Sequence, residues 1–246
     1  MKWIASRCWL ASSIISVGLS AHAATLQISP VMVDLQANEN AAGITLRNPG
    51  DQPLYGQVRV FRWDQANGDD TLTPTGDVVA SPPLVQIAGQ ADQLVRLVQI
   101  AHAAPTQPPA EASYRIMIDE LPQANAAPAT GVQVRLRYSV PVFIEPAGAP
   151  GQPKLSWHMM HDGQGWILSV NNTGAKHAQI ARVRVVSQAG KVYDINPGLL
   201  GYALAERTRQ WQVPIPLDAD LSGKVTVQAS VNSEPIVATV TMDPRN

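Results

Sequence analysis

The chain contains very little cysteine. Its only cysteine among 246 residues is Cys8, which lies in a segment that we expect to be removed. Without Cys8 the chain has no thiol, which excludes a disulfide framework, a cysteine-ligated metal and a cysteine nucleophile. The stability of the remaining chain must therefore come from the packing of its side chains.

Charged residues are scarce as well. They make up 15% of the sequence, and the formal net charge is -1. This balance argues against nucleic acid as a main partner, because phosphate binding needs a basic surface. No block of like charge indicates a charged tail or a patch for anionic membranes. Since 45% of the residues are apolar, the chain is globular and long enough for one large core or two ordinary ones.

Enzyme motifs are missing too. The sequence has no G-x-S-x-G, no H-E-x-x-H and no phosphate-binding glycine loop. His158 and His161 are the only close pair of histidines, and a spacing of three puts them on opposite faces of a strand, which disfavours joint metal ligation. Asp64, Asp69 and Asp70 surround a turn without the spacing of a calcium loop, which favours a solvated hairpin. We therefore expect no catalytic residue, metal, cofactor or small-molecule substrate.

The apolar run nearest the N-terminus extends from Trp9 to Leu19. It is shorter than the roughly 18 to 20 residues that span a bilayer, which disfavours a membrane anchor. Lys2 and Arg7 precede the run, and the small residues of Ala21-His22-Ala23 follow it. This order predicts a secretory signal peptide, residues 1–23, that is cleaved after Ala23 and takes Cys8 with it.

Short apolar runs with a period of two recur along the rest of the chain, and no helical period is sustained. This pattern predicts antiparallel strands in β-sandwiches. The segment EPAGAPGQPK interrupts the series with prolines and glycines and has the composition of a linker. We therefore predict a first domain at 24–146, a linker at 147–153 and a second domain at 154–246. The stretches at 105–112 and 123–131 are predicted to be mobile loops of the first domain.

The most unusual strand is GVQVRLRYSVPVFIEP, from Gly131 to Pro146. Its apolar alternation would extend over roughly 40 Å, about twice the length of a usual strand. Pro141 cannot donate a ladder hydrogen bond, so the strand must have an edge or a switch point there. Its N-terminal half is therefore a candidate for pairing with a strand of another protein. The alternative is that it is simply the last strand of the first domain.

Several segments together resemble the periplasmic chaperones of chaperone–usher pili, and most closely the archaic, Csu-type branch. They are SPVMVDL, LRNPGDQPLYGQVRVFRWDQANGDDTLTPTGDVVASPPLVQIAGQADQLVRL, YRIMIDELP, RLRYSVPVFIEP, WILSVNNTGAKHAQI and GLLGYALAERTRQW. The resemblance implies two immunoglobulin-like β-sandwich domains set at an angle like a boomerang. It identifies YRIMIDELP as the F strand and Gly131–Pro146 as the G strand of the first domain.

The resemblance also implies a binding mode, in which the chaperone lends its G strand to a pilin that lacks its own last strand. In this sequence the lent residues would be Val132, Val134, Leu136 and Tyr138, and the strand would divide at about Ser139. The partners would be pilin subunits and an outer-membrane usher in the periplasm, and self-association of the free chaperone is left open.

One departure from the family pattern concerns the anchor for the carboxylate at the C-terminus of the subunit. Classical members use an arginine on the first strand and a lysine on the G strand, but SPVMVDL contains no basic residue and Pro141 stands at the lysine position. By charge and placement, the candidates here are Arg115, Arg96 and Arg137, because arginine pairs with carboxylates through two hydrogen bonds. A solvated strand arginine is the alternative for each.

Two other classes of protein are alternatives to the chaperone. One is a secreted two-domain β-sandwich adhesion or pilus structural protein. A pilin-like subunit would be a single incomplete domain, usually with a disulfide and an N-terminal donor extension. A secreted β-sandwich enzyme or carbohydrate binder would have paired carboxylates or a row of exposed tryptophans, whereas Trp63, Trp157, Trp166 and Trp211 are scattered over the strands. The sequence therefore favours a non-enzymatic chaperone.

Overall fold

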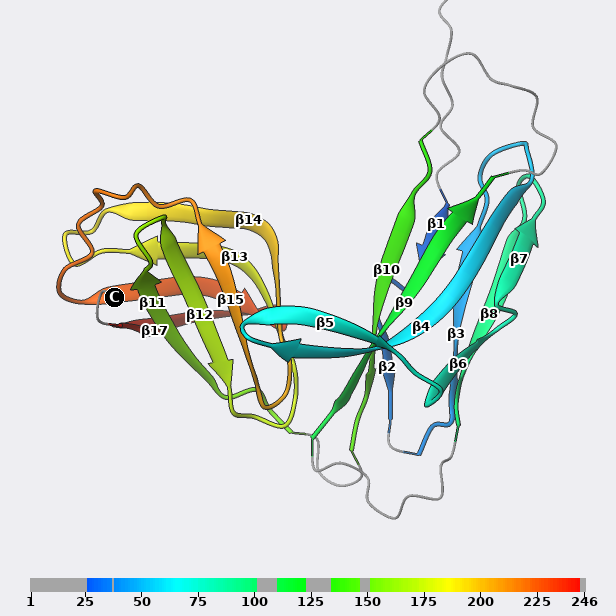
Figure 1. The fold of residues 1–246 in the computed structure, drawn as a ribbon, viewed down its shortest axis with the longest axis horizontal. Helices are drawn as coiled ribbons and strands as arrows, with labels where there is room; N and C mark the ends of the chain where they lie inside the picture. The colour runs from blue at the N-terminus through cyan, green and yellow to red at the C-terminus, as the bar shows by residue number, and fades with distance from the viewer. Residues whose placement is uncertain (1–25, 37, 101–109, 123–133, 147–150, 244–246) are drawn as a thin grey trace, which may run out of the picture.

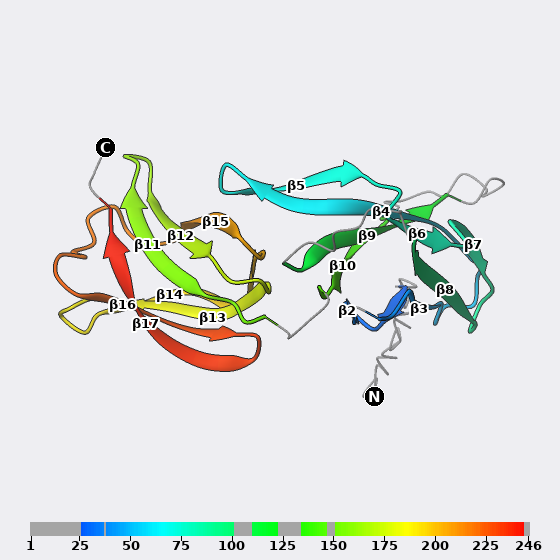
Figure 2. The same ribbon diagram turned by 90° about the horizontal axis from the view of Figure 1, so that it is seen from below.

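A computed structural model describes residues 26–36, 38–100, 110–122, 134–146 and 151–243. These residues form strands and turns and no α-helix. In particular, no helix with the length and hydropathy of a membrane span occurs among them. Figures 1 and 2 show two groups of strands set at an angle to each other.

The first domain is a sandwich of two sheets. One sheet has the order β1-β3-β8-β6, and the other has the order β2-β10-β9-β4-β5, with β7 also paired to β4. The strands of the first sheet are β1 (Gln27–Ser29), β3 (Ala41–Arg47), β8 (Asp92–Gln99) and β6 (Val78–Ser81). Those of the second are β2 (Val33–Leu35), β10 (Arg137–Ile144), β9 (Ala112–Leu121), β4 (Leu54–Ala66), β5 (Asp69–Pro74) and β7 (Leu84–Ile87).

The core of this domain lies between its two sheets. Alternate residues of each strand point inward, as expected for strands with one buried face. Ile44 and Leu97 from one sheet and Ile116, Ile118 and Val142 from the other are completely buried in one apolar cluster.

The second domain is built from strands in the order β14-β13-β16-β17-β11-β12-β15. Their bounds are β11 (Leu155–His161), β12 (Trp166–Asn172), β13 (Ala178–Val186), β14 (Val192–Ala203), β15 (Arg207–Val213), β16 (Val225–Val231) and β17 (Glu234–Met242). A separate apolar cluster includes Trp157, Met159, Leu168, Ile180 and Val227. The two clusters divide between Ile144, where β10 ends, and Leu155, where β11 begins. The finer bounds of the predicted linker stay a prediction, since 147–150 lie outside the described residues.

A buried asparagine holds a turn in each domain. In the first domain, Asn48 Nδ2 donates to the carbonyls of Gln52, Ile87 and Ala88, and its Oδ1 accepts from Gly50 N. In the second, Asn172 Nδ2 donates to three carbonyls in the same way, and its Oδ1 accepts from Gly174 N. The three acceptors are the carbonyls of Lys176, Ala203 and Leu204. Both asparagines are completely buried. Each of them therefore has a structural role in its turn.

The hairpin of β4 and β5 reaches from the first domain to the second (Figures 1 and 2). Its turn has positive φ at Asn67 and Gly68, as the Asn-Gly pair predicts. Gly68 O accepts a hydrogen bond from Gln210 N at 2.9 Å. Gln65 Nε2 donates to Tyr202 O, and Gln65 Oε1 accepts from Leu204 N.

The aspartates of this hairpin are not simply solvated, which corrects the expectation from the sequence. Asp64 pairs with Arg207 at 2.5 Å, and Asp69 pairs with Arg209 at 2.8 Å. Burial is the largest single influence on the Asp64 carboxyl and opposes its ionisation. The hydrogen bonds from Arg207 and from the backbone of Gln65, together with the charges of Arg207 and Arg62, outweigh burial and lower the pKa of Asp64. The cluster therefore joins the two domains.

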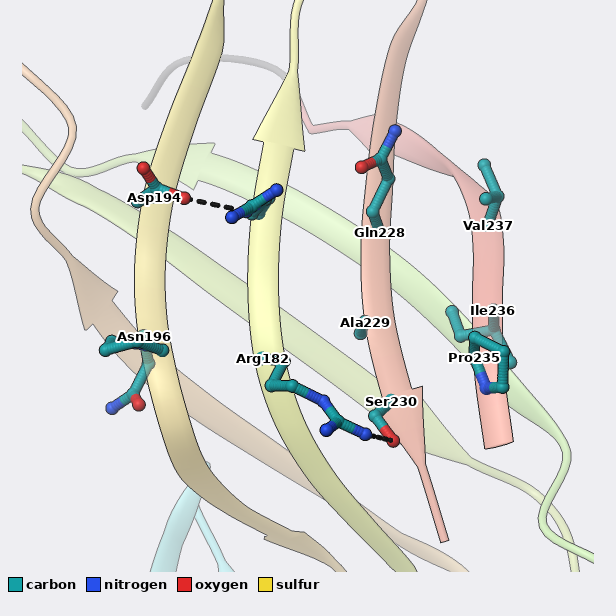
Figure 3. Close-up of a pocket in the computed structure, with 11 residues that line it drawn as sticks. Arg182, Asp194, Asn196, Gln228, Ala229, Ser230, Pro235, Ile236 and Val237 are labelled. Atoms are coloured by element: carbon teal, nitrogen blue, oxygen red, sulfur yellow. Dashed lines mark hydrogen bonds and ion pairs between the residues drawn. The ribbon is translucent and has the colours of Figure 1, made fainter. Parts of the chain in front are cut away.

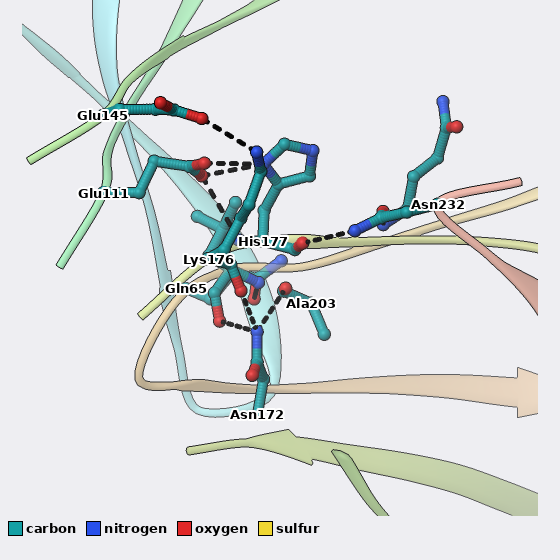
Figure 4. A network of polar contacts seen from close by, with 10 residues as sticks. Gln65, Glu111, Glu145, Asn172, Lys176, His177, Ala203 and Asn232 are labelled. Carbon is teal, nitrogen blue, oxygen red and sulfur yellow. Dashed lines mark hydrogen bonds and ion pairs between the residues drawn. The ribbon is translucent and has the colours of Figure 1, made fainter. Parts of the chain in front are cut away.

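A second correction concerns the predicted loop at 105–112, of which 110–112 are described. Glu111 is buried, and its carboxylate lies 2.8 and 3.0 Å from His177 Nδ1 of the second domain (Figure 4). The His177 ring stacks on Phe143 with a centroid distance of 3.6 Å. Beside this pair, Lys176 Nζ donates to Glu145 at 2.9 Å. The C-terminal end of this stretch is thus part of the contact between the domains. The predicted loop at 123–131 lies outside the described residues.

Candidate functional site

Strand β10 is paired along its whole length on one side and only at its end on the other. Its partners in antiparallel β9 extend from Asp119, opposite Arg137, to Ala112, opposite Ile144. On the other side, β2 pairs in parallel with Val142 to Ile144 alone. Within the described residues, the segment from Arg137 to Pro141 therefore has an open backbone edge. Such an edge can accept a strand from another chain.

The inward-facing side chains of this strand extend beyond the core. Val140, Val142 and Ile144 are buried in the core of the first domain. Tyr138 is partly buried at its rim, whereas Leu136 is 37% exposed and Val134 is 72% exposed. Val132 lies outside the described residues. The predicted donor residues that are described therefore form a row whose exposure rises toward the N-terminus.

Glu120 holds the start of this strand. Its backbone N donates to Leu136 O at 3.1 Å, and its Oε1 accepts from the Tyr138 hydroxyl at 3.0 Å. Burial and this hydrogen bond raise the pKa of Tyr138 to about 12. The ladder between β9 and β10 thus continues by one bond to Leu136, and Val134 lies beyond it.

Arg115 faces outward from β9, directly opposite Pro141 in the register. Its guanidinium carbon lies 3.7 Å from the centre of the Trp63 ring and 5.3 Å from the centre of the Tyr202 ring. Burial lowers the pKa of Arg115, but an arginine stays protonated in proteins. Among the described residues, no hydrogen bond or ion pair involves this guanidinium. Arg115 is thus a half-buried cation with free donors.

The other two anchor candidates lie elsewhere. Arg137 is on the same outer face as Arg115 but forms an ion pair with Asp119, which also pairs with Arg59 at 2.6 Å. The hydrogen bond from Arg137 is the main reason for a lowered pKa of Asp119. Arg96 is exposed on β8 of the opposite sheet, where it pairs with Gly43 and Ser81. The structure therefore brings Arg115 and Arg137 to one face and leaves Arg96 apart.

The sequence patterns did not identify two residues that belong to this site. Trp63 from β4 and Tyr202 from β14 pack together with ring centroids 5.3 Å apart and nearly perpendicular planes. Strand alternation places Trp63 on the same face as Arg59, but no local pattern indicates that a residue of the second domain covers it. The contact depends on the arrangement of the domains.

No other region of the described chain forms a comparable site. No group of three or more His, Cys, Asp or Glu residues there could hold a metal ion. A shallow hollow of about 670 Å³ lies on the outer face of the second domain (Figure 3). Its charged groups are already paired, Arg184 with Asp194 and Arg182 with Ser230.

The sequence was also compared with models of protein families. The model for the pili and flagellar-assembly chaperones, PapD N-terminal domain, matches residues 25–150. The chain belongs to this family. Proteins of this chaperone family are not enzymes, and neither is this one. The predicted resemblance to pilus chaperones, the all-β class and the two-domain immunoglobulin-like fold are confirmed.

Solved structures of pilus chaperones have the same fold. A complex of CsuC with the tip adhesion subunit CsuE, from archaic Csu pili of Acinetobacter baumannii, matches with 24% identity and a TM-score of 0.69, covering 90% of this chain and 100% of that one. A complex of the Salmonella enterica SafA pilin with the SafB chaperone has 17% identity and a TM-score of 0.61, covering 87% and 96%. The E. coli chaperone DraB has 18% identity and a TM-score of 0.59, covering 89% and 97%. No curated protein sequence matches the chain.

Proposed function

We propose that this chaperone is exported to the periplasm by residues 1–23, binds pilin subunits by lending them its G strand, and delivers them to the outer-membrane usher. The observation that carries the proposal is the open edge of β10 with its overhanging row of apolar side chains. The similar structures from Acinetobacter baumannii and Salmonella enterica are complexes of a chaperone with a pilus subunit, which supports a pilin as the partner.

The lent residues are Val132, Val134, Leu136 and Tyr138. A subunit that lacks its last strand exposes an apolar groove, and alternate side chains of a donated strand fill it. Burying each large apolar side chain contributes about 1.5 to 3 kcal/mol, and each ladder hydrogen bond adds about 0.5 to 1.5 kcal/mol. Several of each are enough to hold a subunit until the usher exchanges the strand, without ATP.

Arg115 is the proposed anchor for the carboxylate at the C-terminus of the subunit. Its position opposite Pro141 places it beside the site where classical members keep their lysine. Its donors have no partner within the described residues, whereas Arg137 is already paired with Asp119. Arg96 is the weakest of the three candidates, because it lies on the opposite sheet.

The test is pilin capture by variants of the overhanging row. Val134→Asp and Leu136→Asp are expected to reduce recovery of the chaperone–pilin complex by more than about 100-fold, because each puts a charge into an apolar groove. The free variants should melt at the wild-type temperature, since both side chains are already exposed.

Val237→Asp is the matched control, because Val237 is 70% exposed on the second domain. It carries the same chemical change on a valine of nearly equal exposure and should capture pilin as the wild type does. Undiminished capture by both Val134→Asp and Leu136→Asp would refute the assignment of the donor strand.

A further inference from the structure

The environment of Arg115 is unusual for a structural arginine. Its guanidinium carbon lies over the Trp63 ring, 3.7 Å from the ring centre. Its nitrogens have no hydrogen bond within the described residues. They are not fully buried either, because Trp63 Nε1 is the only fully buried side-chain atom without a partner in that part of the chain. One face of the guanidinium is thus covered by rings while its N–H groups remain accessible.

The rings that cover Arg115 come from both domains. Trp63 belongs to β4 of the first domain, and Tyr202 belongs to β14 of the second. The backbone carbonyl of Tyr202 accepts a hydrogen bond from Gln65 Nε2 at 2.8 Å, and its hydroxyl accepts one from Gln179 Nε2 at 2.9 Å. Tyr202 is therefore held in place by residues of both domains.

We infer that Trp63 and Tyr202 are positioning residues, which hold the Arg115 guanidinium with its donors directed at a carboxylate. This inference rests on the proposed role of Arg115 as the anchor. An arginine whose rotamer is already restricted loses less conformational entropy when it binds. The rings also displace water from one face of the cation, which strengthens its attraction to an anion.

The arrangement makes carboxylate binding depend on the second domain. Without Tyr202, Arg115 would keep its contact with Trp63 but lose the ring that covers that tryptophan at the domain boundary. The guanidinium would then sample more orientations, so its affinity for a carboxylate would fall although every hydrogen-bond donor is still present.

The test uses sodium acetate as the carboxylate probe and acetamide as the uncharged control, added to the whole protein at constant ionic strength. The readout is the NMR signal of the Arg115 Nε–H group, which is assigned by its loss in Arg115→Ala. In the wild type this signal should shift saturably with acetate and not with acetamide. Tyr202→Leu should raise the dissociation constant about three- to tenfold.

Tyr202→Phe is the conservative variant, because it keeps the ring and loses only the bond to Gln179. Its dissociation constant should stay within about twofold of the wild type. Since Tyr202 is buried, Trp63→Leu provides an independent variant in the other domain and decides the question if Tyr202→Leu does not fold. It should weaken acetate binding at least as much, because it removes the ring in direct contact.

The outcomes distinguish a failure of Arg115 as the anchor from a failure of the rings as positioning residues. If Arg115 in the wild type does not respond to acetate, Arg115 is not the anchor and the proposed function loses that part. If Arg115 responds with the same dissociation constant in the wild type and in the leucine variants, the anchor stands and the positioning role of the rings is refuted.

Discussion

The last strands of the two domains pair in the same way but begin differently. Strand β10 pairs antiparallel with β9 and, only at its end, parallel with β2. Strand β17 pairs antiparallel with β16 and, only at its end, parallel with β11. In β17 the inward-facing Ile236 and Ala238 still pack on the core, whereas the inward row of β10 continues past the core to Val134.

The connection that precedes each strand explains this difference. A two-residue turn, Asn232-Ser233, joins β16 to β17 and places Glu234 directly opposite Val231. The chain between β9 and β10, by contrast, extends from Pro122 to Leu136. A tight turn limits a strand to the length of its partner, while a long connection allows it to overhang. The last strand is therefore matched to its partner in the second domain and extends past the core in the first.

Exchanging the connection gives the largest expected effect. If residues 120–136 are replaced by Asn-Ser, Asp119 and Arg137 are joined as Val231 and Glu234 are in the second domain. Pilin capture should fall below detection in co-purification, because the overhanging row is gone. The shorter loop reduces the entropy of the unfolded chain, but the pairs of Glu120 and Leu121 with β4 are lost. A cooperative melting transition serves as the control that the variant is folded. A variant that still captures pilin would show that the overhang is not the donor.

The sequence predicts the parts of this site that depend on local patterns and misses the parts that depend on contacts between distant residues. The alternation in Gly131–Pro146 is a local signal, and it indicated both the strand and its exposed row. Glu111 was assigned to a mobile loop, because proline-rich composition does not reveal a partner such as His177, 66 residues away in the chain. The pairing of Trp63 with Tyr202 and the distance of Arg96 from the site likewise depend on how sheets and domains pack, which no local pattern contains.

The second prediction concerns the buried asparagine that holds a turn in each domain. Asn48→Ala and Asn172→Ala should each lower the free energy of unfolding by about 2 to 4 kcal/mol, because each leaves buried carbonyls without donors. Urea denaturation of the two variants should give similar losses. The tryptophans of the second-domain core, such as Trp157, report which domain unfolds. A loss confined to one variant would show that the two asparagines are not equivalent.

The third prediction tests whether the two domains are coupled. Glu111→Ala removes the acceptor for both the ring and the backbone N of His177, which should lower the free energy of unfolding by about 1 to 3 kcal/mol. We expect one urea transition for the wild type and two for Glu111→Ala. Glu111→Gln retains an acceptor oxygen and should lose less. If Glu111→Ala unfolds like the wild type, this buried pair does not connect the domains.

The smallest predicted effect is the titration of Tyr138 at the point where β10 leaves the core. Because the folded pKa of about 12 lies above the ordinary value of 10.0, folding favours the neutral phenol. Below pH 10 both states hold the proton and the stabilisation is fully present. As the pH rises from 10 to 12, the unfolded state loses the proton first, so the free energy of unfolding falls.

The difference in ultraviolet absorbance between wild type and Tyr138→Phe measures this pKa directly. Glu120→Gln should lower it only in part, because burial, the largest single cause, remains. If Tyr138 titrates near 10, its side chain is solvated and belongs to the overhang rather than to the edge of the core.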